Sequence, residues 1–239
     1  MNPINLKSVI FDLDGTLLDT ADEIHYIFNK VLTVNNLPLQ SKEYYKDNIG
    51  NGIDHLLTKI LPKDFVGDYK LILSQAKELY SKYLNKKAKP FDGIYDILDL
   101  LGEKNIDIGI VTNKIHTLAE RCVELFFNKY NIVIIGAEYL YPKKPAPDSA
   151  LFLADKFNFQ PANILFIGDS QIDICTAKNA KMLSAGVLWG NGSRAEFQNE
   201  GADIIFSEPL NLKTFLMDQM NPIFVGIIQL EVELKIQHD

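Results

Sequence analysis

Short hydrophobic runs alternate along the chain with longer stretches in which hydrophobic positions recur at helical spacing. The short runs have the length of β-strands and lie at residues 8–11, 106–111, 132–135, 164–167 and 204–206. The helical patterns between them lie at residues 94–102, 115–127 and 147–157. Strands buried on both faces are hydrophobic throughout, and parallel strands need crossover connections that are usually helical. The pattern therefore predicts an α/β fold, with a parallel sheet covered by helices on both faces.

The segment between residues 17 and 90 differs because it is helical almost throughout. One amphipathic stripe runs through Ile24, Ile27, Phe28, Val31 and Leu32. The stretch 64–87 carries a second stripe through Leu71, Ala76, Leu79, Tyr80 and Tyr83. A helical insertion after the first strand predicts a cap over the strand ends. We therefore expect an α/β core formed by residues 1–16 and 91–239, and an all-helical cap domain formed by residues 17–90.

Composition narrows the class of protein. The chain has 239 residues, of which 47% are hydrophobic and 23% charged, which is typical of a soluble globular protein and excludes disorder. With 24 Lys and Arg against 31 Asp and Glu, the net charge of -7 argues against a nucleic-acid partner. The longest late hydrophobic stretch, at 222–230, is about half of what a membrane span needs. No targeting segment is visible, and the two cysteines lie far apart, so we expect a cytoplasmic protein without a membrane partner.

The C-terminal end of the chain shows a different periodicity. Leu230, Val232, Leu234 and Ile236 alternate with charged residues, which is typical of a half-buried strand. We interpret this segment as an added edge strand or a dimer contact. The sequence therefore leaves two assemblies open, a monomer and a homodimer.

Polar residues that could take part in catalysis or metal binding follow four of the predicted strands, either directly or in the next loop. They are Asp12-Leu13-Asp14-Gly15-Thr16, Thr112-Asn113-Lys114, Lys144 in a Lys-Lys-Pro-Ala-Pro loop, and Gly168-Asp169-Ser170-Gln171-Ile172-Asp173. In a parallel sheet the carboxyl ends of all strands meet at one edge, where ligands bind. These groups are therefore expected to converge on one site.

Each of these residues also has an ordinary structural explanation. An aspartate can cap a helix, Thr112 can simply end a strand, and Lys144 can be a solvated loop residue. Four carboxylates at two strand ends are harder to explain in this way, because like charges repel and burial makes the repulsion more costly. A hard divalent cation with oxygen ligands would offset the charge of Asp12, Asp14, Asp169 and Asp173.

The ordered set of motifs resembles a known family. Asp12-Leu13-Asp14-Gly15-Thr16-Leu17-Leu18-Asp19-Thr20, Thr112-Asn113, Lys144-Pro145 and Gly168-Asp169-x-x-x-Asp173 occur in the order found in the haloacid-dehalogenase-like hydrolase superfamily. The resemblance runs from about residue 7 to residue 210. It implies a Rossmann-like core sheet and a mobile helical cap.

The resemblance also implies a role for each motif residue. Asp12 is expected to be the nucleophile that forms an aspartyl-phosphate, and Asp14 the general acid and base. Mg²⁺ is expected on Asp12, Asp169 and the backbone carbonyl of Asp14, with Asp173 as a further ligand or a support. Thr112 and the backbone N–H of Asn113 are expected to bind the phosphoryl oxygens, and Lys144 to stabilise the transferring group.

The substrate is the least determined part of the prediction. Relatives with dehalogenase activity lack the second acid, so Asp14 implies a phosphatase or a phosphomutase. Gly50, Asn51 and Gly52 resemble the substrate-facing cap loop of phosphoglycolate phosphatases, and Thr112-Asn113-Lys114 and Gly190-Asn191-Gly192-Ser193 resemble the same branch. The glycines would let backbone N–H groups approach an anion, although Asn-Gly is also a common turn dipeptide.

We therefore expect an enzyme whose partner is a small phosphorylated metabolite, with 2-phosphoglycolate as the leading substrate. The alternative enzymes are a broad-specificity sugar-phosphate or nucleotide phosphatase, an inorganic pyrophosphatase and a β-phosphoglucomutase-like mutase. A non-catalytic phosphate-binding regulator is the remaining alternative, but a protein that only binds phosphate does not need Asp12 and Asp14 as a pair.

Overall fold

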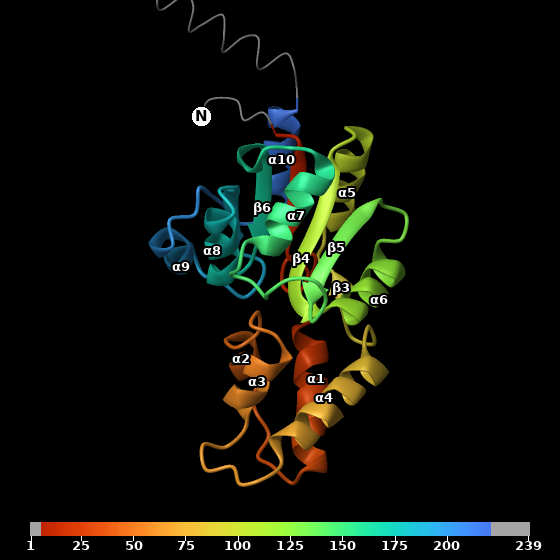
Figure 1. Ribbon diagram of the computed structural model, residues 1–239, viewed down its shortest axis with the longest axis vertical. Helices are drawn as coiled ribbons and strands as arrows, with labels where there is room; N and C mark the ends of the chain where they lie inside the picture. The colour runs from red at the N-terminus through yellow and green to blue at the C-terminus, as the bar shows by residue number, and fades with distance from the viewer. Residues whose placement is uncertain (1–5, 221–239) are drawn as a thin grey trace, which may run out of the picture.

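A computed structural model describes residues 6–220 (Figure 1). It contains a six-stranded sheet in the order β5-β4-β1-β6-β7-β8. Every neighbouring pair in this sheet is parallel. The strands are β1 (Ser8–Phe11), β4 (Asp107–Ile115), β5 (Ile132–Ala137), β6 (Ile164–Gly168), β7 (Leu183–Val187) and β8 (Ile204–Phe206). The chain builds outward from β1 to β5 on one side and then from β6 to β8 on the other. This reversal next to β1 is where open parallel sheets bind ligands.

Helices cover the sheet on both faces, which confirms the predicted fold class. The core helices are α5 (Ile94–Glu103), α6 (His116–Phe126), α7 (Asp148–Phe157), α8 (Gln171–Asn179), α9 (Arg194–Asn199) and α10 (Pro209–Gln219), and a short 3₁₀ turn lies at Pro161–Asn163. Successive residues of β1 serve opposite faces, as the strand geometry requires. Val9 and Phe11 belong to the hydrophobic cluster that contains α5, α6 and α10, whereas Ile10 belongs to the cluster that contains α7 and α8.

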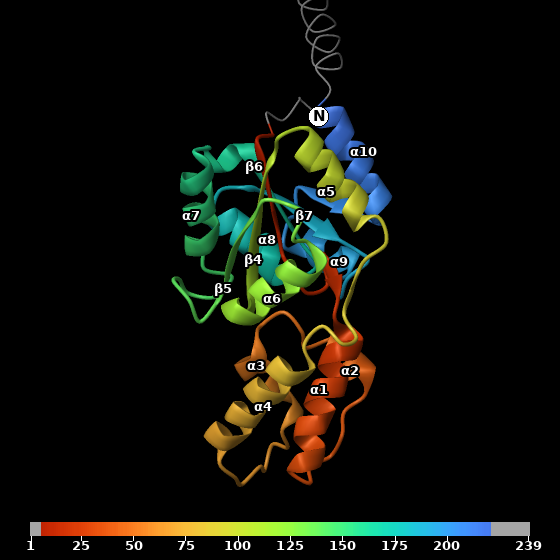
Figure 2. The same ribbon diagram turned by 90° about the vertical axis from the view of Figure 1, so that its right-hand side faces the viewer.

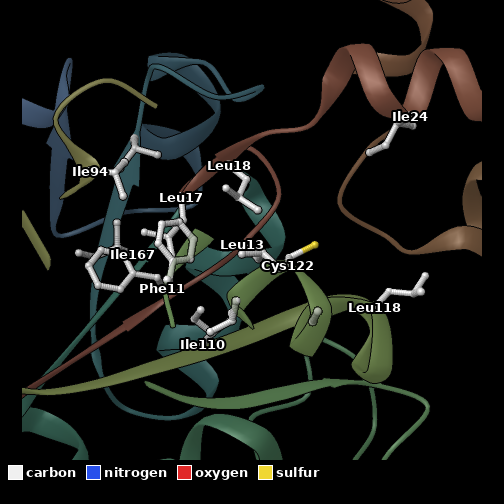
Figure 3. Close-up of a cluster of buried hydrophobic side chains, with 14 of the residues drawn as sticks. Phe11, Leu13, Leu17, Leu18, Ile24, Ile94, Ile110, Leu118, Cys122 and Ile167 are labelled. Atoms are coloured by element: carbon white, nitrogen blue, oxygen red, sulfur yellow. The ribbon is translucent and has the colours of Figure 1, made fainter. Parts of the chain in front are cut away.

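The cluster around Phe11 joins the sheet to the loop that follows β1. Phe11, Leu13, Leu17, Leu18 and Ile167 lie together in Figure 3, and each is fully buried. A buried side chain of this size contributes about 1.5–3 kcal/mol by its removal from water. The hydrophobic residues between Asp12 and Asp19 therefore anchor the loop that carries the predicted nucleophile.

Two strands depart from the prediction. The strand predicted at 106–111 continues to Ile115, so that Thr112, Asn113 and Lys114 lie within β4, where its pairing with β5 is irregular. Strand β7 was not predicted, because Leu183-Ser-Ala-Gly-Val is only weakly hydrophobic. Packing requires a small residue in this strand, because a Cβ at Gly186 would lie 2.5 Å from Cδ2 of Phe197.

Helices α1 (Ala21–Val34), α2 (Lys42–Lys46), α3 (Ile53–Ile60) and α4 (Tyr69–Tyr83) lie below the strand ends in both views (Figures 1 and 2). The chain enters and leaves this group through a short antiparallel ribbon of β2 (Leu18–Asp19) and β3 (Lys89–Pro90). The arrangement is consistent with an inserted cap, and the domain boundaries at residues 17 and 90 stay a prediction.

The first predicted cap stripe is confirmed, and the second is wrong at one position. All five predicted hydrophobic residues of α1 are buried. On α4, Ile72, Ala76 and Tyr80 are buried, whereas Leu71 is 54% exposed. Ile72, Ala76 and Tyr80 are spaced four residues apart and share one face, so the neighbouring Leu71 is rotated by about 100° away from it.

Within residues 6–220, no helix is long and hydrophobic enough to cross a membrane. The strand predicted at residues 230–236 lies outside the described residues.

Candidate active site

The predicted site residues meet at the carboxyl ends of β1, β4 and β6. Phe11 pairs with Ile110 on one side and with Ile167 on the other, so the residues that follow these three positions lie at one level. The backbone N–H of Asp12 also donates to the carbonyl of Ile167 at 2.8 Å. The sheet register therefore places Asp12 beside the ends of both neighbouring strands, as predicted.

A tight loop after β1 requires glycine. Gly15 has φ +87°, and a Cβ there would lie 2.1 Å from Oδ2 of Asp169. The loop is closed by a bond from the N–H of Gly15 to the carbonyl of Leu18 at 2.8 Å. Thr16 donates from its hydroxyl to Oδ1 of Asp169 at 3.2 Å. The Asp-x-Asp-Gly-Thr sequence thus brings the β1 loop into direct contact with the acidic residue that follows β6.

Three of the predicted metal ligands form a buried acidic cluster. Carboxylate oxygens of Asp12, Asp169 and Asp173 lie within 4.8 Å of one another, and each residue is at most 4% exposed. Burial, reinforced by the neighbouring Asp173 and Asp14 charges, raises the pKa of Asp12 to about 7 against the opposing effect of Lys144. Burial and the charges of Asp12 and Asp173 raise the pKa of Asp169 to about 8.

These residues fit a divalent metal ion. Within residues 6–220, the buried Oδ1 of Asp12 has the Lys144 ammonium, 2.8 Å away, as its polar neighbour and accepts from no backbone N–H. Hard cations such as Mg²⁺ prefer carboxylate oxygens, and a cation among these groups would offset both the burial and the repulsion that raise the pKa values of Asp12 and Asp169. Asp12 and Asp169 are therefore the residues best suited to hold it.

Asp173 is fully engaged by the protein. Its Oδ1 accepts from Nζ of Lys144 at 2.6 Å, and its Oδ2 accepts from the backbone N–H of Ser170 at 3.0 Å and from the Ser170 hydroxyl at 2.6 Å. The contacts with Ser170 form the capping box that begins α8. This arrangement favours the supporting role for Asp173, which holds Lys144 in place.

Lys144 is buried between two of the aspartates. Burial by itself would lower its pKa, but the Asp12 and Asp173 carboxylates raise it above its ordinary value, so Lys144 is charged. The Asn113 side chain holds the Lys144 backbone, accepting from its N–H at 2.9 Å and donating to its carbonyl at 3.2 Å. The same Asn113 amide donates to the carbonyl of Gly50 at 2.9 Å. The Asn113 side chain thus positions both the lysine loop and the cap loop.

The loop that contains Gly190 and Asn191, which resembles that of phosphoglycolate phosphatases, holds Asp169 in position. Oδ2 of Asp169 accepts from the backbone N–H of Asn191 at 2.9 Å and from its side-chain amide at 3.0 Å. A Cβ at Gly190 would lie 2.4 Å from Cβ of Asp169. The Gly190-Asn191 segment is therefore part of the site, although the motif residues alone did not assign it a role.

The Asp14 carboxylate lies apart from the acidic cluster and pairs with Lys114. Nζ of Lys114 lies 2.8 Å from Oδ1 and 3.2 Å from Oδ2 of Asp14, and 2.7 Å from the hydroxyl of Tyr80 on α4. Burial alone would lower the pKa of Lys114, but Asp14 raises it well above its ordinary value. The predicted metal contact of Asp14 therefore depends on its backbone carbonyl. Sequence reasoning assigned no role to Lys114 or Tyr80, and the only signals were the Thr-Asn-Lys triplet and the α4 stripe.

A cavity lies between the strand ends and the cap. It has an empty volume of about 500 Å³, part of which is open to solvent. Asp12, Asp14, Thr112, Asn113 and Lys114 line it from the core. The cap lines it largely with hydrophobic groups, at Ile24, Phe28, Asn48, Ile49, Gly50, Gly52, Ile53, Leu56 and Tyr80.

The predicted cap loop reaches this cavity in part. Gly50 and Gly52 line it, but Asn51 between them does not. Both glycines have positive φ, at +113° and +84°, and Gly52 precedes the first residue of α3. The loop is therefore a turn into α3 and also a wall of the cavity, so the two interpretations of the Gly-Asn-Gly sequence are compatible.

The family model for haloacid dehalogenase-like hydrolases matches residues 9–187, and the chain belongs to this family. It is 30% identical over 216 residues to a phosphoglycolate phosphatase of Aquifex aeolicus, which covers 87% of this chain and 95% of the relative. It is 32% identical over 227 residues to a phosphoglycolate phosphatase of Shigella boydii, with 86% and 87% covered. The chain therefore falls in the phosphoglycolate phosphatase-like branch and is a phosphoric monoester hydrolase.

Solved structures agree with this placement. A predicted phosphoglycolate phosphatase from Haemophilus somnus superposes with a TM-score of 0.80 at 26% identity, covering 89% of this chain and 98% of that chain. A β-phosphoglucomutase from Clostridium difficile superposes with a TM-score of 0.72 at 21% identity, covering 92% and 99%. The second match shows a shared fold alone, so the fold does not separate phosphatases from mutases.

Proposed function

We propose that the protein is a Mg²⁺-dependent phosphatase that hydrolyses a small phosphomonoester through an aspartyl-phosphate, with 2-phosphoglycolate as the substrate. The observation that carries the proposal is the Asp12 carboxylate. It is buried at the carboxyl end of β1, lines the cavity, and has its Oδ1 2.8 Å from the Lys144 ammonium. A nucleophile that faces a cavity beside a buried cation suits phosphoryl transfer.

In the first step an Asp12 oxygen attacks phosphorus and the bond from phosphorus to the leaving oxygen breaks. Asp14 donates its proton to that oxygen, so that the product leaves as an alcohol. In the second step the Asp14 carboxylate takes a proton from water as the water oxygen attacks phosphorus. The bond to Asp12 then breaks, which releases phosphate and restores both aspartates.

The remaining core groups bind the phosphoryl oxygens. Thr112 supplies its hydroxyl and Asn113 its backbone N–H, because the Asn113 side chain is already engaged by Lys144 and Gly50. Lys144 is held beside Asp12 and supplies positive charge to the transferring group. Mg²⁺ held by Asp12, Asp169 and the Asp14 carbonyl would offset the repulsion between the phosphate and Asp12.

The choice of 2-phosphoglycolate rests on the relatives and on the cap loop. The relatives from Aquifex aeolicus and Shigella boydii are named phosphoglycolate phosphatases and align over most of this chain. The turn at Gly50 and Gly52 brings unsubstituted backbone to the cavity wall, where N–H groups can meet a substrate carboxylate.

One observation favours a second candidate, a phosphatase of broader specificity. The cap side of the cavity presents Ile24, Phe28, Ile49, Ile53 and Leu56. Such a surface suits phosphomonoesters with an apolar part at least as well as it suits glycolate.

The test is phosphate release in the presence of Mg²⁺ from 2-phosphoglycolate, pyrophosphate, sugar phosphates, nucleotides and nitrophenyl phosphate. The Asp12→Asn variant controls for a contaminating phosphatase. A strong preference for 2-phosphoglycolate supports the leading proposal, and comparable rates with several esters support the second candidate. Formation of a stable aspartyl-phosphate without phosphate release would instead indicate a mutase and overturn both.

A further inference from the structure

Lys114 is a buried ammonium group that the chemistry above does not use. Its side chain is 1% exposed, and Nζ has three oxygen neighbours, the two carboxylate oxygens of Asp14 and the Tyr80 hydroxyl. The ammonium also lies 4.7 Å from the centre of the Tyr80 ring. Tyr80 comes from α4 of the cap, whereas Lys114 and Asp14 come from the core. Lys114 therefore links Asp14, the predicted general acid and base, to the cap.

A second cap residue, Glu23, places a carboxyl group within electrostatic range of Lys114. Glu23 on α1 is fully buried, and its Oε1 has no hydrogen-bond partner among residues 6–220. Burial raises the pKa of Glu23, and the Lys114 charge is the strongest effect opposing that rise. Lys114 thus contacts Asp14 of the core and Tyr80 of the cap, and its charge also acts on Glu23 of the cap.

Stability does not explain this arrangement. Burying an ion pair can cost as much desolvation energy as the pair returns, and buried charges that line a cavity are more frequent at functional sites. Here both oxygens of Asp14 contact one ammonium group, which restricts the rotation of the carboxylate. General acid catalysis depends on such restriction, because the proton must lie within hydrogen-bond reach of the leaving oxygen.

We propose that Lys114 is a positioning residue for Asp14, and that Tyr80 fixes Lys114 so that the cap supports the proton-transfer step. The proposal rests on the proposed function of Asp14 as general acid. It predicts that loss of Lys114 or of the Tyr80 hydroxyl slows the departure of leaving groups that need a proton, and leaves substrate affinity nearly unchanged.

The experiment compares two leaving groups in a single turnover of the Mg²⁺-loaded enzyme, by rapid quench. Nitrophenolate leaves without a proton, whereas the alcohol of an alkyl phosphate needs one. The alkyl substrate is 2-phosphoglycolate, or the alkyl phosphate that the wild type hydrolyses fastest in the panel. The variants are Lys114→Met, Tyr80→Phe and Asp14→Asn. Tyr45→Phe is the matched control, because Tyr45 is also a buried cap tyrosine that packs on Phe28 and donates its hydroxyl away from the site, to Asn29.

We expect Lys114→Met to slow release of the alcohol roughly 100-fold, at the lower end of what general acid catalysis contributes. Tyr80→Phe should slow it ~10-fold, since one hydrogen bond is lost. Release of nitrophenol should fall only a few-fold in both variants, KM should hold, and Tyr45→Phe should match the wild type.

The outcomes separate this proposal from the proposed function. Equal slowing of both substrates, or a rise in KM without loss of kcat, overturns the positioning role and assigns Lys114 to phosphate binding or folding. Full activity of Lys114→Met and Tyr80→Phe beside an impaired Asp14→Asn overturns the positioning role alone. If Asp14→Asn does not slow the alkyl substrate selectively, the general acid is misassigned and both fall. Should Lys114→Met fail to fold, Tyr80→Phe against Tyr45→Phe carries the test.

Discussion

The buried acidic cluster predicts an unusual dependence of stability on pH when no metal is bound. The pKa of Asp12 rises to about 7 and that of Asp169 to about 8 in the folded protein, against an ordinary value of 3.8 for each. Between these values the folded state binds more protons than the unfolded state. The free energy of unfolding therefore falls as pH rises from about 4 to about 8, which is opposite to the usual behaviour of paired aspartates.

The expected size follows from the pKa of Asp12. A rise from 3.8 to about 7 is worth on the order of 4 kcal/mol at high pH. Part of the pKa rise of Asp169 comes from its repulsion by Asp12, so the two contributions to the free energy of unfolding do not add in full. For a chain of this size each kcal/mol moves the melting temperature by about 2–4 °C. We expect the Tm of the metal-free protein to fall by about 10 °C between about pH 5 and about pH 8.5.

The assay is thermal unfolding of the chelator-treated protein at both pH values, repeated with excess MgCl₂. Metal binding requires deprotonated carboxylates, so the Tm gain from Mg²⁺ should be small at the lower pH and large at the higher one. A metal concentration of about 100 times Kd stabilises by about 2.7 kcal/mol. Asp169→Asn is the matched variant, because it removes one carboxylate and keeps the side-chain volume. It should reduce both the pH dependence and the Mg²⁺ gain.

A metal-free Tm that falls no more steeply with rising pH in the wild type than in Asp169→Asn would contradict the raised pKa values of Asp12 and Asp169. A Mg²⁺ gain that is the same at both pH values would contradict them as well.

Three further predictions concern activity and packing. Asp12→Asn should lower turnover by about 10⁴-fold or more while circular dichroism stays that of the wild type; near-normal turnover would place the nucleophile elsewhere. Gly15→Ala should lower kcat about 100-fold, since the new Cβ would lie 2.1 Å from Asp169 Oδ2, and phosphate release at the wild-type rate would contradict the loop geometry. Leu101→Ala, at a fully buried position of α5, should cost about 2–5 kcal/mol in chemical denaturation with unchanged KM. A loss below about 1 kcal/mol would show that the side chains around Leu101 repack to fill the cavity.

The sequence by itself determined the fold class and the meeting of the acidic residues. Hydrophobic runs of strand length separated by helical patterns allow few arrangements other than a covered parallel sheet. Since the carboxyl ends of parallel strands share one edge, Asp12, Thr112 and Asp169 had to lie close together whatever the detailed packing. The motif order then pointed to the haloacid dehalogenase-like hydrolases, which the family comparison bears out.

Only the tertiary structure decided which groups pair within that site. Nothing local in the sequence shows that Lys114 bonds Tyr80, 34 residues away, or that it holds Asp14, 100 residues away. The same holds for the Asn113 amide, which joins Gly50 to the Lys144 loop. Strand β7 was also not predicted, because its sequence is only weakly hydrophobic. Its small residues make room for Phe197 of α9, a contact that only the tertiary structure shows. Periodicity records which face of an element is buried, whereas the partners of a buried polar side chain depend on how elements distant in the chain pack together.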